Sequence, residues 1–339
     1  MKRASHLFEK VLDFHNLCAS ARQAAKGKKP TLSSDMFLMN LESQVLALQR
    51  ELYGRTYAPG PYRSFLVRDP KVRVISAAPF RDRVVHHSLC RAIEPVLERY
   101  AISDSYACRI GKGNRAAVER VQNLASGYDW YLKLDVMHFF ETADHAILMG
   151  LLGRLIKDPA TLWLLRRFVE GGPSIQNPGK GLPIGNLTSQ HFANLYLGPL
   201  DHFVKEKLRL HGYVRYMDDM IMLGRSMEQM VDAWAAVDAF LRESLSLSLR
   251  TEVCMVNRVD DGVPFLGFRI WRNQIRFDGH RKRRFQRRVG SLASSMRRGT
   301  IGEEEFAARM GSLTAWARQA NTLGLRRTTF GLRGIDHLK

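Results

Sequence analysis

The sequence contains few cysteines, and they do not cluster. Cys18, Cys90, Cys108 and Cys254 lie far apart and form no Cys-x-x-Cys motif. Zinc sites and the disulfide frameworks of small secreted domains both need closely spaced cysteines, so the sequence supports neither. Isolated cysteines fit a reducing cytoplasm, in which they serve as small buried hydrophobic residues.

Long apolar runs are also missing. No run approaches the roughly 20 residues of a membrane-spanning helix, and the N-terminus lacks the apolar core of a secretory signal peptide. The chain has no internal repeats, no low-complexity tract and no amphipathic anchor for a membrane surface. We therefore expect no association with a membrane and a cytoplasmic location.

Acidic residues are scarce relative to basic ones. The 33 Asp and Glu stand against 52 Lys and Arg, which gives a formal net charge of +19. Such a surplus predicts a polyanionic partner, and without a membrane anchor nucleic acid is favoured. The 339 residues, 45% hydrophobic and 25% charged, are otherwise typical of a globular protein with about two domains.

Hydrophobic spacing predicts helices and one hairpin in the first third of the chain. A helix with Asp35 as its N-cap is predicted over 35–53, because apolar residues recur there at intervals of three and four. A β-hairpin is predicted over 62–77, with its turn at 69–71. A following helix is predicted from five apolar positions: Val84, Val85, Leu89, Ile93 and Leu97.

Later segments mix strands and helices, which indicates an α+β protein. Strands are predicted over 130–136 and 263–271, and a helix over 146–170. Another helix should bury one face, formed by Val231, Trp234, Val237, Phe240 and Leu241. From Asn273 onward the sequence predicts a small, strongly basic helical module.

Two adjacent carboxylates, Asp218 and Asp219, lie between two β-favouring segments. The pattern predicts a hairpin with Tyr-Met-Asp-Asp as its turn, and alone it fits a solvent-exposed acidic turn equally well. Asp135 also ends an apolar strand. If the two strands are neighbours in one sheet, the carboxylates converge and can bind two divalent cations about 4 Å apart. Mg²⁺ prefers such oxygen ligands together with substrate phosphates.

The motifs and their order resemble those of reverse transcriptases, most closely those of diversity-generating retroelements. The resemblance extends from about Leu38 to beyond Phe268. Four segments carry it: Lys133 to Phe140 resembles the first palm motif, Gly181 to Gln190 the box before the long palm helix, Tyr216-Met217-Asp218-Asp219 the catalytic box, and Phe265-Leu266-Gly267-Phe268 the primer grip.

The resemblance implies a right-hand polymerase fold of the α+β class. Residues 1–60 would form an N-terminal helical extension packed on the fingers, 61–128 and 143–187 the fingers, 129–142 and 188–271 the palm with its antiparallel sheet and helices, and 272–339 a basic helical thumb.

The resemblance also implies roles for individual residues. Asp135, Asp218 and Asp219 would be catalytic and bind two Mg²⁺ ions, for which Mn²⁺ could substitute. The nucleotide-binding residues would be Lys71, Arg73, Phe140, Ile184, Gly185 and Gln190, with the Phe140 ring as a steric gate against ribonucleotides. Template or primer contacts would come from Tyr106, Arg109, Lys112, Tyr216, Met217, Phe265, Leu266, Gly267, Arg284 and Arg287.

The box at 184–190 indicates the subclass. Most reverse transcriptases have Gln at the position of Ile184 and Pro at that of Gln190, whereas the diversity-generating enzymes have an aliphatic residue, Gly and then Ser-Gln, as here. In that family the box accompanies poor fidelity opposite template adenines. Gly185 would let the backbone approach the nascent base pair closely. The alternative is that Ile184 fills the core of a faithful enzyme.

The resemblance therefore predicts an RNA-directed DNA polymerase that copies a template RNA into adenine-mutagenised cDNA. Its partners would be dNTPs, template RNA, the RNA/cDNA duplex and a basic oligomeric accessory variability protein. Two alternatives stay open: another bacterial reverse transcriptase of group II intron or antiphage type, and an inactive RNA-binding scaffold. One departure is Val253, which occupies the place of a family lysine thought to protonate pyrophosphate.

Overall fold

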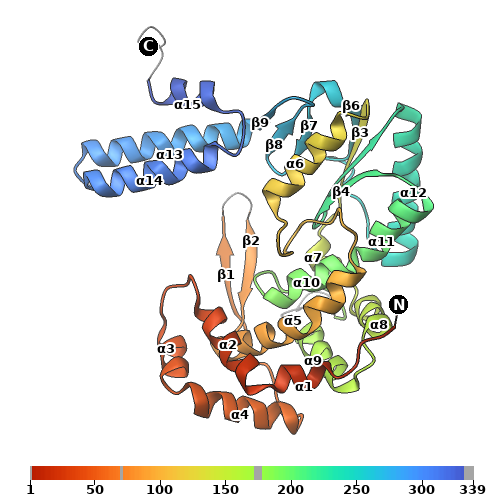
Figure 1. Ribbon diagram of the computed structural model, residues 1–339, viewed down its shortest axis with the longest axis vertical. Helices are drawn as coiled ribbons and strands as arrows, with labels where there is room; N and C mark the ends of the chain where they lie inside the picture. The colour runs from red at the N-terminus through yellow and green to blue at the C-terminus, as the bar shows by residue number, and fades with distance from the viewer. Residues whose placement is uncertain (1, 69–71, 172–177, 332–339) are drawn as a thin grey trace. The chain divides into compact units, whose positions relative to one another are not determined.

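The chain forms two compact units. A computed structural model describes residues 2–68, 72–171 and 178–331. The first unit draws on Met1–Arg109, Val136–Arg209 and Ala236–Arg250, and the second on Ile110–Asp135, Leu210–Ala235 and Thr251–Lys339. Each unit is thus assembled from three separate stretches of the sequence (Figure 1).

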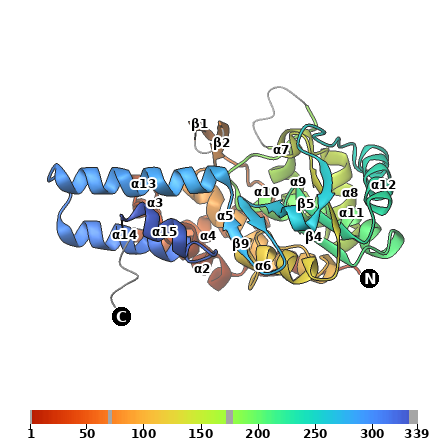
Figure 2. The same ribbon diagram turned by 90° about the horizontal axis from the view of Figure 1, so that it is seen from above.

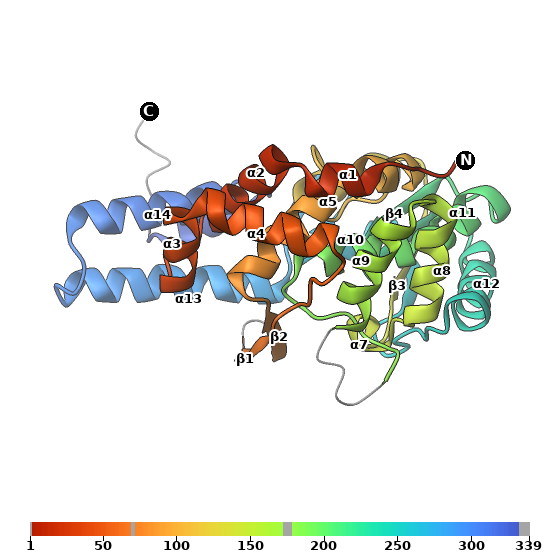
Figure 3. The ribbon, with the colours of Figure 1, turned by 90° about the horizontal axis from the view of Figure 1, so that it is seen from below.

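The first unit is mainly helical and is built around α5 (Phe80–Tyr100), against which α1, α2, α3 and α10 all pack (Figure 3). Its antiparallel hairpin pairs β1 (Arg63–Val67) with β2 (Arg73–Ala77), as predicted. The other elements are α1 (Leu7–Leu12), α2 (Phe14–Ala25), α3 (Leu32–Met39), α4 (Leu41–Tyr53), α7 (Phe139–Thr142), α8 (His145–Leu155), α9 (Pro159–Glu170), α10 (Leu187–Tyr196), α11 (Gly198–His202) and the π-helical segment η1 (Phe203–Lys207).

The central position of α5 follows from its sequence. All five apolar positions predicted for it are buried. Its first turn also carries a buried carboxylate, Asp82, which accepts hydrogen bonds from the Tyr57 hydroxyl (2.6 Å) and the Gly60 N–H (2.7 Å). A buried carboxylate needs such donors, and here they fasten the segment before β1 to the start of the helix.

Two of the predicted helices are interrupted. Residues 35–53 belong to α3 and α4, which meet at Asn40. Asp35 is not the N-cap: Thr31 is, because its hydroxyl accepts from the Ser34 N–H while the Ser34 hydroxyl accepts from the Thr31 N–H. The segment 146–170 likewise divides into α8 and α9, since the Asp158 carboxylate caps a new helix. Local capping groups therefore decided where these helices begin.

The second unit contains two antiparallel sheets. One has the strand order β4-β5-β3-β6 and the other the order β7-β8-β9. The helix α6 (Asn114–Ala125) packs against β4, β5 and β8. The strands are β3 (Trp130–Asp135), β4 (Gly212–Tyr216), β5 (Asp219–Gly224), β6 (Met255–Arg258), β7 (Val263–Phe265), β8 (Phe268–Ile270) and β9 (Ile275–Phe277), with the 3-10 turn η2 (Val259–Asp261) before β7.

The predicted strand over 263–271 is wrong, because this segment forms the hairpin β7–β8. The chain reverses at Leu266 and Gly267, which both have positive φ (49° and 78°). Two consecutive left-handed residues make the tight turn that joins neighbouring antiparallel strands. The prediction failed because the apolar residues continue through the turn without a polar break.

The C-terminal part is helical, as predicted. The helices α13 (Gly279–Arg297) and α14 (Glu303–Ala317) run antiparallel, and α15 (Leu323–Thr329) follows (Figure 2). Four buried residues form their core: Phe285, Val289, Leu313 and Ala317. Partly buried Trp316 and Met310 pack against this core. These helices therefore hold together through apolar contacts despite their high positive charge.

The long helix α12 (Met227–Leu245) passes from the second unit into the first. Val237 and Leu241 are fully buried, as predicted, but Val231 is 46% exposed. The predicted apolar face is therefore correct only toward the C-terminal half of the helix. None of the helices in the described ranges is long and apolar enough to cross a bilayer.

Candidate active site

Three aspartates meet at one end of the four-stranded sheet. In the antiparallel pairing of β3 with β5, Asp135 lies directly opposite Asp219. Asp218 precedes Asp219 in the turn that joins β4 to β5. The prediction that the two acidic strand ends belong to neighbouring strands is therefore confirmed, and it brings the carboxylates together.

The turn between β4 and β5 is shorter than predicted. Tyr216 already pairs with Asp219, so only Met217 and Asp218 form the turn. Met217 has a φ of 54°, a left-handed conformation that costs roughly 1–2 kcal/mol for a residue with a side chain. Fully buried Arg215 donates from Nη1 to the Met217 carbonyl at 3.2 Å. The strained turn is thus held from within the sheet.

Arg215 is a supporting residue that none of the sequence motifs indicates. The available signal was a lone guanidinium in an otherwise apolar strand. A charge in that position needs buried acceptors, and the Met217 carbonyl in the turn between β4 and β5 supplies one.

The carboxylate of Asp219 lies in an environment that disfavours its charge. Burial above all, together with the nearby charges of Asp135 and Asp218, raises its pKa to about 7, while Lys133 and the Leu266 N–H oppose the rise. The Lys133 ammonium is 3.9 Å from Asp219 Oδ1. Within the described part of the chain, this oxygen accepts no hydrogen bond. A bound cation would compensate the charge of a buried carboxylate oxygen that accepts no hydrogen bond.

The aspartates have the donor chemistry that divalent cations require. Hard cations such as Mg²⁺ bind carboxylate oxygens, and the carboxylates of Asp135 in β3, Asp219 in β5 and Asp218 in the preceding turn could hold them. Among residues 2–68, 72–171 and 178–331, no three His, Cys, Asp or Glu side chains already surround one point as a metal cluster. The aspartates thus offer suitable ligand chemistry for divalent cations at one end of the sheet.

The box at 184–190 packs against the hairpin of the first unit. The Ser76 N–H in β2 donates to the Ile184 carbonyl at 2.8 Å. Gly185 has a φ of 115°, and a Cβ added there would lie 2.8 Å from Cγ2 of Ile75. Both the backbone angle and the close approach of β2 therefore require glycine. Contact of this glycine with a nascent base pair stays a prediction.

Phe140 differs from its neighbour in exposure. Phe139 is buried and packs against Tyr196, as expected of a core residue. Phe140 is only partly buried, and its carbonyl accepts from the Leu182 N–H at 2.6 Å. The 181–190 box thus anchors its backbone while the ring remains partly exposed. Its role as a steric gate stays a prediction.

The other nucleotide-binding candidates lie in different surroundings. Arg73 is exposed at the start of β2, where it pairs with Val67. Lys71 lies outside the described residues. Gln190 accepts a hydrogen bond from Cys108 Sγ at 3.2 Å through Oε1. This oxygen of Gln190 thus contacts the protein itself.

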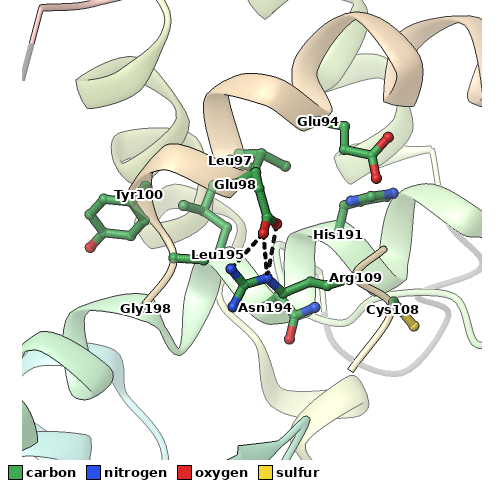
Figure 4. Close-up of a pocket in the computed structure, with 11 residues that line it drawn as sticks. Glu94, Leu97, Glu98, Tyr100, Cys108, Arg109, His191, Asn194, Leu195 and Gly198 are labelled. Atoms are coloured by element: carbon green, nitrogen blue, oxygen red, sulfur yellow. Dashed lines mark hydrogen bonds and ion pairs between the residues drawn. The ribbon is translucent and has the colours of Figure 1, made fainter. Parts of the chain in front are cut away.

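Arg109 is engaged within the first unit (Figure 4). Its guanidinium contacts both carboxylate oxygens of Glu98 and also donates to the carbonyls of Ile102 (2.5 Å) and Ser105 (2.7 Å). Its side chain is only 9% exposed. The adjoining cavity of about 30 Å³ accommodates no more than a water-sized group. Arg109 therefore braces the loop after α5, and its contact with template stays a prediction.

The remaining template and primer candidates divide by exposure. Tyr106 and Phe265 are buried, at 9% and 1% exposure. Arg287 is exposed. The partly buried candidates are Lys112, Tyr216, Met217, Leu266, Gly267 and Arg284. Among the residues predicted to form the primer grip, the Leu266-Gly267 turn is more accessible than Phe265.

The chain is similar to several known proteins in sequence or in fold. YkfC of Escherichia coli (strain K12) is 23% identical over 290 residues, which are 73% of this chain and 76% of that protein. The group II intron-encoded protein LtrA of Lactococcus lactis subsp. cremoris is 25% identical over 170 residues, 48% of this chain but only 28% of that protein. The solved structure of apo telomerase from Candida tropicalis, truncated from the C-terminal domain, matches with a TM-score of 0.52 at 9% identity, covering 68% of this chain and 59% of that one.

The structural likeness bears on the fold alone, and it confirms the predicted α+β, right-hand polymerase fold. Residues 67–270, more than half of the chain, match the family described as "Reverse transcriptase (RNA-dependent DNA polymerase)". The chain therefore belongs to the reverse transcriptase family.

Proposed function

We propose that the chain copies a template RNA into cDNA with errors directed to template adenines, as the polymerase of a diversity-generating retroelement. The observation that carries the polymerase activity is the register that sets Asp135 opposite Asp219, beside Asp218. The subtype rests on Ile184-Gly185 followed by Ser189-Gln190, where most reverse transcriptases have Gln and Pro.

In this proposal the three aspartates hold two divalent cations, Mg²⁺ or Mn²⁺. Such ions would supply positive charge for in-line attack by a 3′-hydroxyl and for the departing pyrophosphate. The protein's part is to orient the carboxylates. Lys133 and the Leu266 N–H favour the ionised form of Asp219, against the burial that raises its pKa. Cation binding would therefore displace the proton from the Asp219 carboxylate.

The nucleotide would be held by residues of the first unit. Lys71 and Arg73 would bind the triphosphate, for which an ammonium and a guanidinium are suited. The Phe140 ring would exclude a ribose 2′-hydroxyl. Ile184 would replace a hydrogen-bonding amide with an aliphatic side chain beside the nascent pair. Pocket shape alone discriminates by only about 1–3 kcal/mol, so lower fidelity is compatible with continued synthesis.

The proposal keeps the division of the polymerase hand given by the motifs. The N-terminal extension would be 1–60, the fingers 61–128 and 143–187, the palm 129–142 and 188–271, and the thumb 272–339. Template RNA and the RNA/cDNA duplex would be bound by this hand. A basic oligomeric accessory protein would assist it, as in the family that the 184–190 box resembles.

The test is primer extension on a defined RNA template with Mg²⁺ and dNTPs, followed by sequencing of the products. We expect frequent errors confined to template adenines. Asp218→Ala should lower synthesis by roughly 10³-fold, because losing a metal ligand removes several kcal/mol of transition-state stabilisation. Asp232→Ala, at an exposed position on α12, is the matched control and should leave synthesis unchanged.

A second candidate is a reverse transcriptase of the group II intron type, which the similarity to LtrA favours. It predicts accurate copying at adenines in the same assay. An inactive scaffold instead predicts no synthesis even with the accessory protein and native RNA. Full synthesis by Asp218→Ala would contradict the catalytic role of the aspartates in either enzyme.

A further inference from the structure

Arg281, in the first turn of α13, lies against two aromatic rings of other elements. Its guanidinium carbon is 4.0 Å from the ring centroid of Phe268 in β8 and 5.7 Å from that of Trp316 in α14. Burial lowers its pKa. Most other basic residues of segment 281–288 are exposed instead: Lys282, Arg283, Arg287 and Arg288. Arg281 is thus turned inward, where a planar cation stacks on aromatic faces.

The same guanidinium lies close to the turn between β7 and β8. A Cβ added to Gly267 would collide with Arg281 Nε and lie 3.0 Å from Arg281 Cδ. Asp278, the N-cap of α13, donates its N–H to the Gly267 carbonyl at 3.1 Å and accepts from the Arg281 N–H at 2.7 Å. The start of α13 therefore holds one side of the turn.

The other side of the turn faces Asp219. The Leu266 N–H lies near enough to the Asp219 carboxylate to favour its ionised form, which lowers its pKa. Leu266 and Gly267 are consecutive left-handed residues, so the direction of this N–H depends on the conformation of the turn. One short loop thus connects Arg281 to Asp219.

We propose that Arg281 is a positioning residue that stacks on Phe268 and Trp316, fixes the Leu266-Gly267 turn and thereby orients the Asp219 carboxylate. The inference rests on the proposed function, in which Asp219 is catalytic. It separates Arg281 from its neighbours on α13, whose charges would bind backbone phosphates. A positioning residue should affect the incorporation rate and leave duplex affinity unchanged. A phosphate-binding residue should affect duplex affinity and leave the rate unchanged.

The experiment compares Arg281→Ala and Arg281→Lys with Arg287→Ala in the full chain. Single-turnover incorporation rate, affinity for a labelled primer–template duplex and thermal unfolding are measured for each. We expect Arg281→Ala to lower the rate roughly 10- to 100-fold, as loss of a supporting contact behind a ligand does, and to leave the duplex Kd within about twofold. Arg287→Ala should weaken binding and spare the rate at saturating duplex.

Arg281→Lys separates charge from stacking. Lysine keeps the positive charge but lacks the planar guanidinium, so it should not restore the rate. Full recovery with lysine would overturn the proposal, as would loss of affinity with an unchanged rate. Arg309→Ala, an exposed residue of α14 that pairs with Glu305, is the control expected to change neither quantity.

Two further comparisons keep the test decisive. Phe268→Leu removes the stacking partner of Arg281. Its effect on the incorporation rate and that of Arg281→Ala should therefore be strongly non-additive in the double variant. Simple additivity would contradict an effect of Arg281 through its contact with the Phe268 ring. Unfolding of Arg281→Lys would also overturn the proposal, because the contact would then serve packing alone.

Full synthesis by Asp219→Asn would overturn the proposed function itself. An inactive Asp219→Asn beside an unaffected Arg281→Ala would overturn only the positioning role.

Discussion

At the scale of single residues, the contrast between Phe139 and Phe140 makes a functional prediction. Phe139 is buried, whereas the ring of Phe140 is partly exposed five residues after Asp135. If Phe140 excludes the 2′-hydroxyl, Phe140→Ala should admit ribonucleotides. Removing one close steric contact changes discrimination by about 1–3 kcal/mol, so the preference for dNTP over rNTP should fall roughly 10- to 200-fold.

The preference is measured as the ratio of kcat/KM for dATP and ATP on one primer–template. Phe140→Tyr keeps the ring and should retain discrimination, which makes it the matched control. An unchanged ratio in Phe140→Ala would mean that another group excludes ribonucleotides.

The residues of the candidate site differ in how far sequence could predict them. Asp135, Asp218 and Asp219 could be predicted, because carboxylates at apolar strand ends form a local pattern. Arg215 and Arg281 could not, since their partners are a backbone carbonyl and two aromatic rings, which no local pattern specifies. Support from distant parts of the chain requires the fold.

At the scale of elements, α5 carries an acid-sensitive group. His86 is 1% exposed, packs edge-on against Phe168 and has no hydrogen-bond partner for either ring nitrogen among the described residues. Burial lowers its pKa to about 3. The folded pKa is below the unfolded value of about 6.5, so the stabilising effect is complete above pH 6.5 and is lost as pH falls toward 3.

We therefore expect the free energy of unfolding to fall by up to about 1.4 kcal/mol per pH unit through this one group below pH 6.5. Unfolding of His86→Leu should take up one proton fewer between pH 6.5 and 5, so its free energy of unfolding should fall less steeply with decreasing pH. Denaturant unfolding at several pH values measures the slope. His15→Leu, at an exposed histidine on α2, should leave it unchanged. Equal slopes for His86→Leu and the unmodified protein would show that His86 does not control acid stability.

Elements were easier to predict than their ends. The apolar positions of α5 and the pairing of β1 with β2 follow directly from spacing. Spacing does not predict the helix breaks at Asn40 and Asp158 or the turn at Leu266-Gly267. These depend on capping hydrogen bonds and left-handed backbone angles. Hydrophobic periodicity indicates which face of an element is buried but does not predict a short break in a helix or a turn within a strand.

At the scale of the whole molecule, the order of the motifs could be predicted, but the composition of the two units could not. Each unit takes three separate stretches, and β3 pairs with strands that come much later in the chain. Such long-range pairing leaves no periodic mark in either strand. The family resemblance supplied the expectation that Asp135 and Asp218 act together, and the sheet register explains how adjacent strands allow it.

The net charge of +19 leads to a prediction about the whole molecule. If the basic residues of α13 bind duplex phosphates, association should release counterions, so log Kd should rise linearly with log salt concentration. Exposed Arg287 and partly buried Arg284 are the candidates on this helix. Replacing both with Ala should lower the magnitude of the slope by about one per lost phosphate contact, whatever the duplex sequence.

Fluorescence anisotropy of a labelled RNA/DNA duplex between 50 and 300 mM salt, a range of about sixfold over which electrostatic binding weakens strongly, measures this slope. Arg309→Ala, which removes an exposed charge from α14 rather than α13, is the control and should leave the slope unchanged. An unchanged slope after loss of both Arg284 and Arg287 would place the phosphate contacts elsewhere. A slope reduced as much by the control would mean that total charge, rather than the basic face of α13, determines duplex binding.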